Sequence, residues 1–268
     1  MKAAARQSGF SLTELIIVIV LLGIVAVIPV SFIRFSAEGA VNTANRQQLS
    51  LSASVASEQL SRALREALPG SIRVSSDQAC IEFIPIVAST VYQSAPMTSP
   101  ANNFPVLALS NGRSAQGHVV IYPYAANQSD LYDPASPGVI SSQTATLPAG
   151  TDSVTLTMDS GSHQFISDSP SRRLFMVSTP VTFCQQGAFL YRYQNYGFQS
   201  TIGAALPSNF ASGREVVAAP LQANSMAFDA LPPTLRRNAI VTFEFAFQSD
   251  RSTDRMTVSQ EVQLRNVP

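Results

Sequence analysis

Residues 9–35 read GFSLTELIIVIVLLGIVAVIPVSFIRF, and the apolar run inside this stretch decides the fold of the first part of the chain. The run extends almost unbroken from Leu15 to Val30. Its length of about 16 to 18 residues is the lower limit for a membrane-spanning helix. Glu14 lies at the edge of the run, although a carboxylate at the centre of such a helix costs roughly 2.5 to 3.5 kcal/mol on insertion scales. A residue that is expensive to place there is expected to have a function.

The residues before the run carry positive charge and end in a glycine. Lys2 and Arg6 predict that the N-terminal side lies in the cytoplasm, because positive charge favours that side of a membrane. A secretory signal has its small-residue cleavage site after the apolar run, whereas the small residue here, Gly9, comes before it. A plain signal anchor would explain the run but would leave Gly9 and Glu14 without a role.

Composition favours an extracytoplasmic, β-rich domain for the remainder of the chain. The 268 residues have a formal net charge of +0, with 46% hydrophobic and 13% charged residues. This balance is less typical of a cytosolic enzyme. Without a basic stripe or a run of like charge, no nucleic-acid partner is expected. The length allows one large domain or two small ones.

The segment GFSLTELIIVIVLLGIVA resembles the class III (prepilin) leader and N-terminal helix of type IV pilins and of the pseudopilins of type II secretion. The resemblance implies that a prepilin peptidase cleaves after Gly9 and methylates the new N-terminus, Phe10. It also implies that Glu14 neutralises the N-terminus of a neighbouring subunit and sets the axial register of a filament. An ion pair between Glu14 and the N-terminus of its own chain, one helical turn away, is the alternative.

Two helix breakers, Gly23 and Pro29, lie inside the apolar helix. Pro29 lacks an N–H and costs about 3 kcal/mol in an ordinary helix interior. In the family, breakers of this kind allow the helix to melt partly when subunits pack into a filament. A simple kink is the other interpretation, and both remain open.

After the apolar run the pattern becomes amphipathic. Small and apolar residues recur at steps of three and four, which predicts one buried stripe of a helix: Leu49, Ala53, Ala56, Leu60, Ala63 and Ala67. Pro69 and Gly70 are expected to end the helix. We therefore expect four parts: a leader at 1–9, a transmembrane or filament-core helix at 10–33, its amphipathic continuation at 34–68, and a β-rich head at 69–268.

The head is expected to contain an antiparallel sheet. In the last segment Val241, Phe243, Phe245 and Phe247 alternate with polar residues, and a second alternating run follows after a turn. Such alternation indicates one buried and one solvated face. Long loops are expected at about 94–117 and 125–150, which are rich in Pro, Ser and Ala. The predicted fold class is α+β and pilin-like, with a long N-terminal helical spine packed on a large antiparallel head.

The cysteines are Cys80 and Cys184. If the membrane segment exports the head, both lie in an oxidising compartment, and an even number favours pairing. A bridge would contribute roughly 4 to 5 kcal/mol in the chain-entropy model. Two buried free thiols are the alternative. Metal binding is disfavoured, because neither cysteine has a second ligand at a CxxC or CxxH spacing.

The head narrows the resemblance. LSRALREALPGSIRV, CIEFIPI and the terminal QEVQLRNVP are similar to the O-type minor pilins of mannose-sensitive haemagglutinin (MSHA) pili, in a group with W-type minor pilins and J-type pseudopilins. This implies a non-enzymatic subunit that primes filament assembly or caps the fibre tip. The alternatives are a J-like minor pseudopilin of a type II secretion system, and a tip adhesin whose head loops bind a surface ligand.

The same resemblance implies the partners and the location. The partners are the prepilin peptidase, the inner membrane, the pilus assembly platform, and the major and other minor pilins, which contact the N-terminal helix. The chain is expected in the inner membrane with a periplasmic head before assembly, and in a surface pilus, at its tip, afterwards.

Enzyme and metal motifs are weak. His118 and His163 are the histidines of the chain, and no nucleophile elbow, zinc motif, P-loop or dinucleotide fingerprint occurs. No catalytic residue and no cofactor is expected, although a membrane-anchored periplasmic enzyme remains an alternative. Acidic loop residues could ligate calcium, but turn chemistry is the favoured explanation: Asp130, Asp133, Asp250 and Asp254.

Overall fold

The computed structural model describes residues 9–110, 112–233, 237–249 and 254–264. The chain divides into two compact units, one up to Gln48 and one from Leu49 onward. The residues before Gly9, which carry the predicted leader charges, lie outside the described residues, and so does Asp250.

The first unit is formed by helix α1 (Leu12–Arg65), which continues into the second. Its apolar side chains are exposed, as expected for a segment whose surroundings are absent from a single chain; Leu15 is 55% exposed and Phe35 is 72% exposed. The helix continues through Gly23 and Pro29. Partial melting at these two residues in a filament stays a prediction.

The second unit begins with the last turns of α1, and these carry the predicted stripe. The stripe is buried except for Ala63, which is partly buried: Leu49, Ala53, Ala56, Leu60 and Ala67. α1 ends at Arg65, and the short 3-10 turn η1 (Pro69–Ser71) follows. Proline at the start of that turn supplies no N–H for a longer helix.

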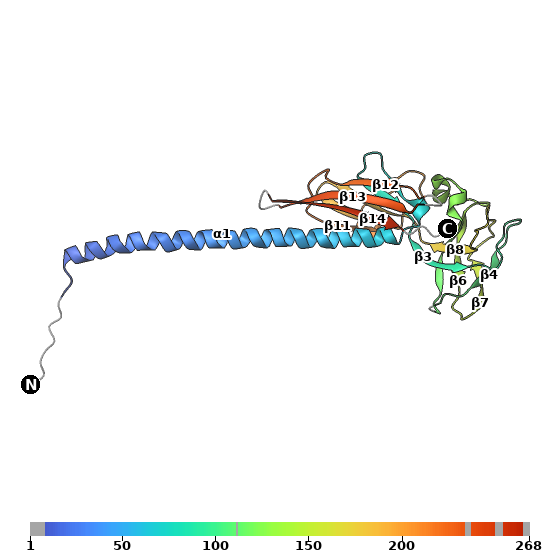
Figure 1. Cartoon of the computed structure of the whole chain (residues 1–268), viewed down its shortest axis with the longest axis horizontal. Helices are drawn as coiled ribbons and strands as arrows, with labels where there is room; N and C mark the ends of the chain where they lie inside the picture. The colour runs from blue at the N-terminus through green and yellow to red at the C-terminus, as the bar shows by residue number, and fades with distance from the viewer. Residues whose placement is uncertain (1–8, 111, 234–236, 250–253, 265–268) are drawn as a thin grey trace, which may run out of the picture. The chain divides into compact units, whose positions relative to one another are not determined.

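Two antiparallel sheets pack on these turns of α1 and share one hydrophobic core with it. Figure 1 shows β11, β13 and β14 beside the end of the helix. The five-stranded sheet has the order β1-β2-β9-β10-β11 and the three-stranded sheet the order β12-β13-β14. Their strands are β1 (Arg73–Val74), β2 (Cys80–Phe83), β9 (Val181–Gln186), β10 (Phe189–Tyr193), β11 (Arg214–Ala218), β12 (Ala227–Leu231), β13 (Ala239–Gln248) and β14 (Arg255–Leu264).

The predicted C-terminal hairpin is confirmed. β13 and β14 pair antiparallel along their whole length, from Ala239 opposite Leu264 to Gln248 opposite Arg255. The alternating residues of β13 are buried: Val241, Phe243, Phe245 and Phe247.

A third, six-stranded sheet is inserted between β2 and β9, with the order β3-β8-β5-β6-β7-β4. Its edge strands meet, because Tyr92 bridges Val106 and the Gln93 N–H donates to the Pro105 carbonyl at 3.0 Å. The sheet therefore closes on itself around its own core. Its strands are β3 (Ile86–Val91), β4 (Asn103–Leu107), β5 (Ala115–Ile121), β6 (Ile140–Leu147), β7 (Ser153–Met158) and β8 (Arg173–Val177). Two 3-10 turns, η2 (Pro123–Ala125) and η3 (Gln128–Tyr132), lie between β5 and β6. A further turn, η4 (Phe210–Ser212), precedes β11 of the five-stranded sheet.

This closed sheet corrects the two long loops expected at 94–117 and 125–150. They contain β4, the start of β5, and the whole of β6. β4 includes Pro105 and β6 is largely polar, so neither shows the apolar alternation by which a strand is recognised. The predicted α+β class, a long N-terminal helix packed on antiparallel sheets, is confirmed.

Candidate functional site

The Gly9–Phe10 junction lies just before α1 in non-helical chain. Phe10 is 79% exposed, and no atom lies within 4 Å of a Cβ built on Gly9. A peptidase needs an accessible bond outside regular secondary structure, and this junction is exposed and non-helical.

Ser11 begins the helix and places Glu14 in its first turn. The Glu14 N–H donates to Ser11 Oγ at 3.3 Å, and the Leu15 N–H donates to the Ser11 carbonyl at 3.2 Å. Ser11 is thus the N-cap and Glu14 the third helical residue, the Ser-x-x-Glu spacing of a capping box. This cap was not predicted, although its Ser-x-x-Glu spacing is visible at residues 11–14.

The cap gives Glu14 a structural role beside the predicted one. A carboxylate in the first turn is favoured by the helix dipole. The same position is one turn from Phe10, where cleavage would create a positive α-amino group. Glu14 can therefore stabilise the first turn of the helix in the uncleaved chain and lie near the α-amino group in the cleaved chain.

Helix α1 is long and apolar enough to cross a membrane, and it is the one such helix among the described residues. None of the 18 residues of its most apolar stretch is buried. A contiguous exposed apolar surface of this kind marks a site of contact with a membrane or with other proteins.

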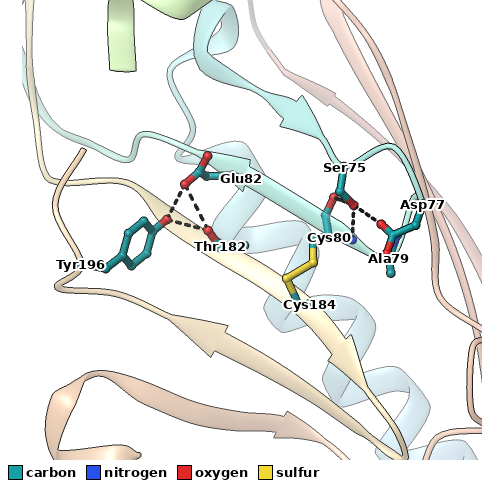
Figure 2. Close-up of a disulfide and its surroundings, with 8 residues drawn as sticks. All are labelled: Ser75, Asp77, Ala79, Cys80, Glu82, Thr182, Cys184 and Tyr196. Atoms are coloured by element: carbon teal, nitrogen blue, oxygen red, sulfur yellow. Dashed lines mark hydrogen bonds between the residues drawn. A yellow bond between two sulfur atoms is a disulfide. The ribbon is translucent and has the colours of Figure 1, made fainter. Parts of the chain in front are cut away.

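In the head, Cys80 and Cys184 form a disulfide. The two residues face each other across β2 and β9 (Figure 2). The turn before Cys80 is held by Ser75, whose Oγ accepts from the Cys80 N–H at 2.9 Å and donates to Asp77 at 2.5 Å. The hydrogen bond from Ser75, with a further one from the Ala79 N–H, lowers the pKa of the Asp77 carboxyl. The bridge ties together the two strands between which the six-stranded sheet is inserted.

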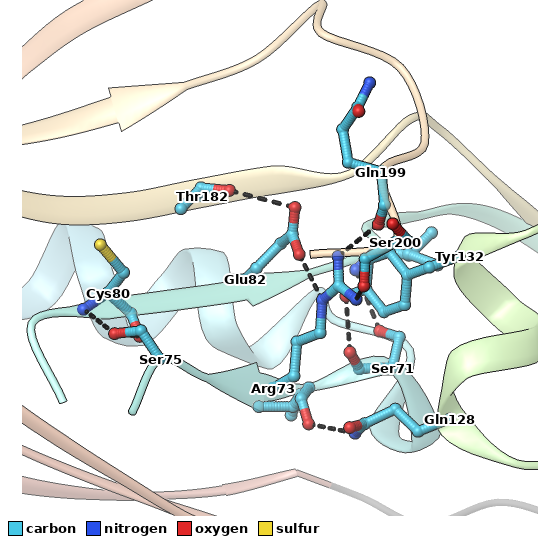
Figure 3. Close-up of polar contacts among 12 residues, drawn as sticks. Ser71, Arg73, Ser75, Cys80, Glu82, Gln128, Tyr132, Thr182, Gln199 and Ser200 are labelled. Carbon is cyan, nitrogen blue, oxygen red and sulfur yellow. Dashed lines mark hydrogen bonds and ion pairs between the residues drawn. The ribbon is translucent and has the colours of Figure 1, made fainter. Parts of the chain in front are cut away.

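A buried polar cluster lies on the same strands and is centred on Glu82, which has no exposed surface. Glu82 forms an ion pair with Arg73 of β1. The Arg73 guanidinium also donates to the Ser200 carbonyl at 2.9 Å and to the Gln199 carbonyl at 2.6 Å (Figure 3). It lies 3.5 Å from the centre of the Tyr132 ring. Arg73 therefore connects the five-stranded sheet to η3 and to the loop before β11.

The other oxygen of Glu82 accepts from Tyr196 at 2.8 Å and from Thr182 at 3.3 Å. Burial, reinforced by the negative charge of Glu82, raises the pKa of Tyr196. Its hydroxyl therefore stays protonated and donates to the carboxylate. The cluster was not predicted, because its members come from segments far apart in the sequence. Arg73, Thr182 and Tyr196 all donate to acceptors within the fold, which is typical of a structural cluster rather than of a catalytic one.

The two histidines lie in different surroundings. His118 Nδ1 is 2.8 Å from the Ser141 carbonyl, and its ring packs on Phe198. His163 is 1% exposed, with Nε2 3.3 Å from the Gly138 carbonyl and no partner for Nδ1 among the described residues. Burial lowers the pKa of His163.

Two of the acidic loop residues, Asp130 and Asp133, lie in the first turn and at the C-cap of η3. Asp130 accepts from the Asn127 N–H at 3.0 Å and caps η3, which is turn chemistry. Asp133 lies at the end of the same turn and is exposed. Among the described residues, no group of three His, Cys, Asp or Glu side chains is placed to hold a metal ion.

Comparison with known proteins gives one match. The family model of the prokaryotic N-terminal methylation motif matches residues 4–28. No curated protein and no solved structure matches the chain. The matched residues include the Gly9–Phe10 junction, the cap and most of the apolar run. The match supports a prepilin-like leader, processing by a prepilin peptidase and membrane anchoring through α1, which is the N-terminal organisation of type IV pilins and pseudopilins.

Proposed function

We propose that this chain is a minor pilin of an MSHA-like type IV pilus, which primes filament assembly or caps the fibre tip. One observation carries the proposal: a methylation motif at residues 4–28 runs directly into an exposed apolar helix with an acid in its first turn. The large head, with a closed sheet inserted into the sheet that packs on α1, supports a subunit used in few copies rather than one repeated along a fibre wall.

In this proposal the leader is 1–9, the membrane and filament-core segment 10–33, its amphipathic continuation 34–68, and the head 69–268. The peptidase cleaves after Gly9, and Phe10 becomes the N-methylated terminus. Before assembly the chain spans the inner membrane once with its N-terminus in the cytoplasm and its head in the periplasm.

Glu14 has its role in the assembled fibre. The α-amino group of Phe10 is a positive charge in apolar surroundings, and a buried charge is tolerable only with a partner. Glu14 of an adjacent subunit supplies that partner and fixes the axial register, while Gly23 and Pro29 allow the helix to adjust as subunits pack. The major pilin, other minor pilins and the assembly platform are the partners of this segment.

The first test is the N-terminus of the native protein. Mass spectrometry should find N-methyl-Phe10, and a chain that retains Met1 would contradict the proposal. A Gly9→Val variant is the matched control, because the branched side chain should block cleavage and leave the membrane helix intact.

The second test is a pilus count by electron microscopy in a deletion strain that still expresses the major pilin. Loss of surface pili with the major pilin retained in the membrane supports priming. If the pili are normal in number but the cells no longer attach, the head acts in adhesion and the priming role is wrong.

A further inference from the structure

Strand β11 forms one edge of the five-stranded sheet, and among the described residues its ladder partner is β10. The opposite edge, β1, is only two residues long. Hydrogen-bonding direction alternates along a strand, so every second residue of β11 directs its N–H and C=O away from β10. A sheet edge of this kind can accept another strand.

A groove runs between this edge and the last turns of α1. Its larger part has a volume of about 820 Å³ and is lined by α1, β9, β10 and β11. A smaller hollow of about 290 Å³ shares Val55 and Val217 with it and extends to Leu51. From Leu51 to Arg65, its last residue, the helix rises about 21 Å. An extended segment of about seven residues covers that length at 3.3 Å per residue.

The walls of the groove expose apolar side chains. On α1, Val55 is 54% and Leu51 is 68% exposed. Val216 of β11 is 57% exposed and pairs with Tyr191, so its side chain lies on the sheet face opposite to that of Glu215. Phe183 of β9, which is 2% exposed, forms part of the lining. An extended strand that pairs with the backbone of β11 would direct apolar residues at alternate positions toward Val55 and Leu51, and the residues between them toward the face that carries Val216.

The charged side chains that line the groove form two ion pairs and leave one carboxylate, at one end, without an ion-pair partner among the described residues. Glu58 and Arg62 lie 4.0 Å apart, and Arg192 and Glu215 lie 3.2 Å apart. Glu66 also lines the groove, and its carboxylate has no ion-pair partner among the residues that the structure describes. The groove therefore has one excess negative charge, which complements a Lys or Arg in the occupant.

We propose that β11 and this groove bind an extended segment of a neighbouring fibre subunit by strand addition. The segment has about seven residues, with apolar residues at alternate positions and a basic residue that meets Glu66. This inference rests on the proposed function, because it assumes that the chain assembles with other subunits. It adds a contact made by the head to those made by the N-terminal helix.

The experiment uses the full-length chain in cells that assemble fibres, with a photo-crosslinking amino acid in place of Val216 or Val55. Both residues are exposed, so neither substitution removes a core contact. Val87 of β3, which is 50% exposed on the inserted sheet, is the control position. We expect the crosslinker at positions 216 and 55 to give adducts that map to the same short segment of one subunit. The crosslinker at position 87 should give no adduct with that segment.

The charge is tested in the same assay. Glu66→Lys should lower the adduct yield up to about fivefold, the effect of one exposed ion pair, and Glu66→Asp should retain it. If the chain carries N-methyl-Phe10 and is present in sheared fibres, yet neither position gives a discrete adduct, the strand inference is wrong and the proposed function stands. If the same sample lacks N-methyl-Phe10, the proposed function itself fails.

Discussion

Substituting Glu82 by alanine removes the acceptor at the centre of the buried cluster. The carboxylate has no exposed surface, and the side chain of its partner Arg73 is 11% exposed. Without Glu82, the Arg73 guanidinium keeps two carbonyl acceptors but no negative charge. Removing one partner of a buried ion pair costs about 3 to 5 kcal/mol. At roughly 2 to 4 °C per kcal/mol for a chain of this size, the melting temperature should fall by roughly 6 to 20 °C.

An exposed ion pair on the same sheet provides the matched control. Arg192 and Glu215 lie 3.2 Å apart, with side chains that are 34% and 38% exposed. Glu215→Ala should cost about 0 to 1 kcal/mol, because solvent screens the pair. In the double variant Arg73→Met/Glu82→Leu both charges are gone, so much of the loss should be recovered.

Urea unfolding of the full-length chain in detergent, with the disulfide intact, measures these differences. The sequence has 7 Tyr and no Trp, so near-ultraviolet circular dichroism of the tyrosines is the signal. Tyr132 and Tyr196 belong to the cluster and report on it directly. A Glu82→Ala variant that unfolds within about 1 kcal/mol of Glu215→Ala would refute the reasoning.

Three further outcomes are expected. Glu14→Ala should leave N-terminal methylation intact and abolish incorporation into sheared fibres, whereas normal incorporation would show that the carboxylate is dispensable. Reduction of Cys80–Cys184, which are separated by 104 residues, should lower the free energy of unfolding by up to about 4 to 5 kcal/mol; a Cys80→Ala/Cys184→Ala variant should not respond to reductant. Burial lowers the pKa of His163 in the folded chain. When the pH falls below the ordinary pKa of histidine, the unfolded chain therefore binds a proton at His163 more readily than the folded chain does. The free energy of unfolding should fall as the pH drops from about 7.5 to 5.5. His163→Gln should show a weaker dependence, and an unchanged pH profile would contradict this.

Local patterns were sufficient for the helical part of the molecule and for the last hairpin. Helical spacing identified the stripe that α1 buries, from Leu49 to Ala63, because residues three and four apart share one helix face. Ala67, the last residue of the stripe, is buried just beyond the end of the helix. Strict alternation identified β13, because its side chains alternate between core and solvent. The Gly9–Phe10 junction and the position of Glu14 were visible for the same reason: the pattern is contiguous.

Pairings between distant segments were not predictable in this way. The six-stranded sheet closes because Tyr92 meets Val106, and neither β4 nor β6 carries an alternating apolar signal. The Glu82 cluster joins Arg73, Thr182 and Tyr196, which no local spacing relates. The edge of β11 could be recognised only once the order of the strands was known.

The sequence by itself determined the apolar helix, its N-terminal motif and the alternation of the final hairpin, since each depends on the spacing of side chains along one continuous segment. The tertiary structure alone decided which strands pair, where the sheet closes and which charges are buried together. Several of these depend on contacts between residues far apart in the sequence, such as Glu82 with Thr182 and Tyr196. Their free energy comes from burial that exists only after the chain has folded.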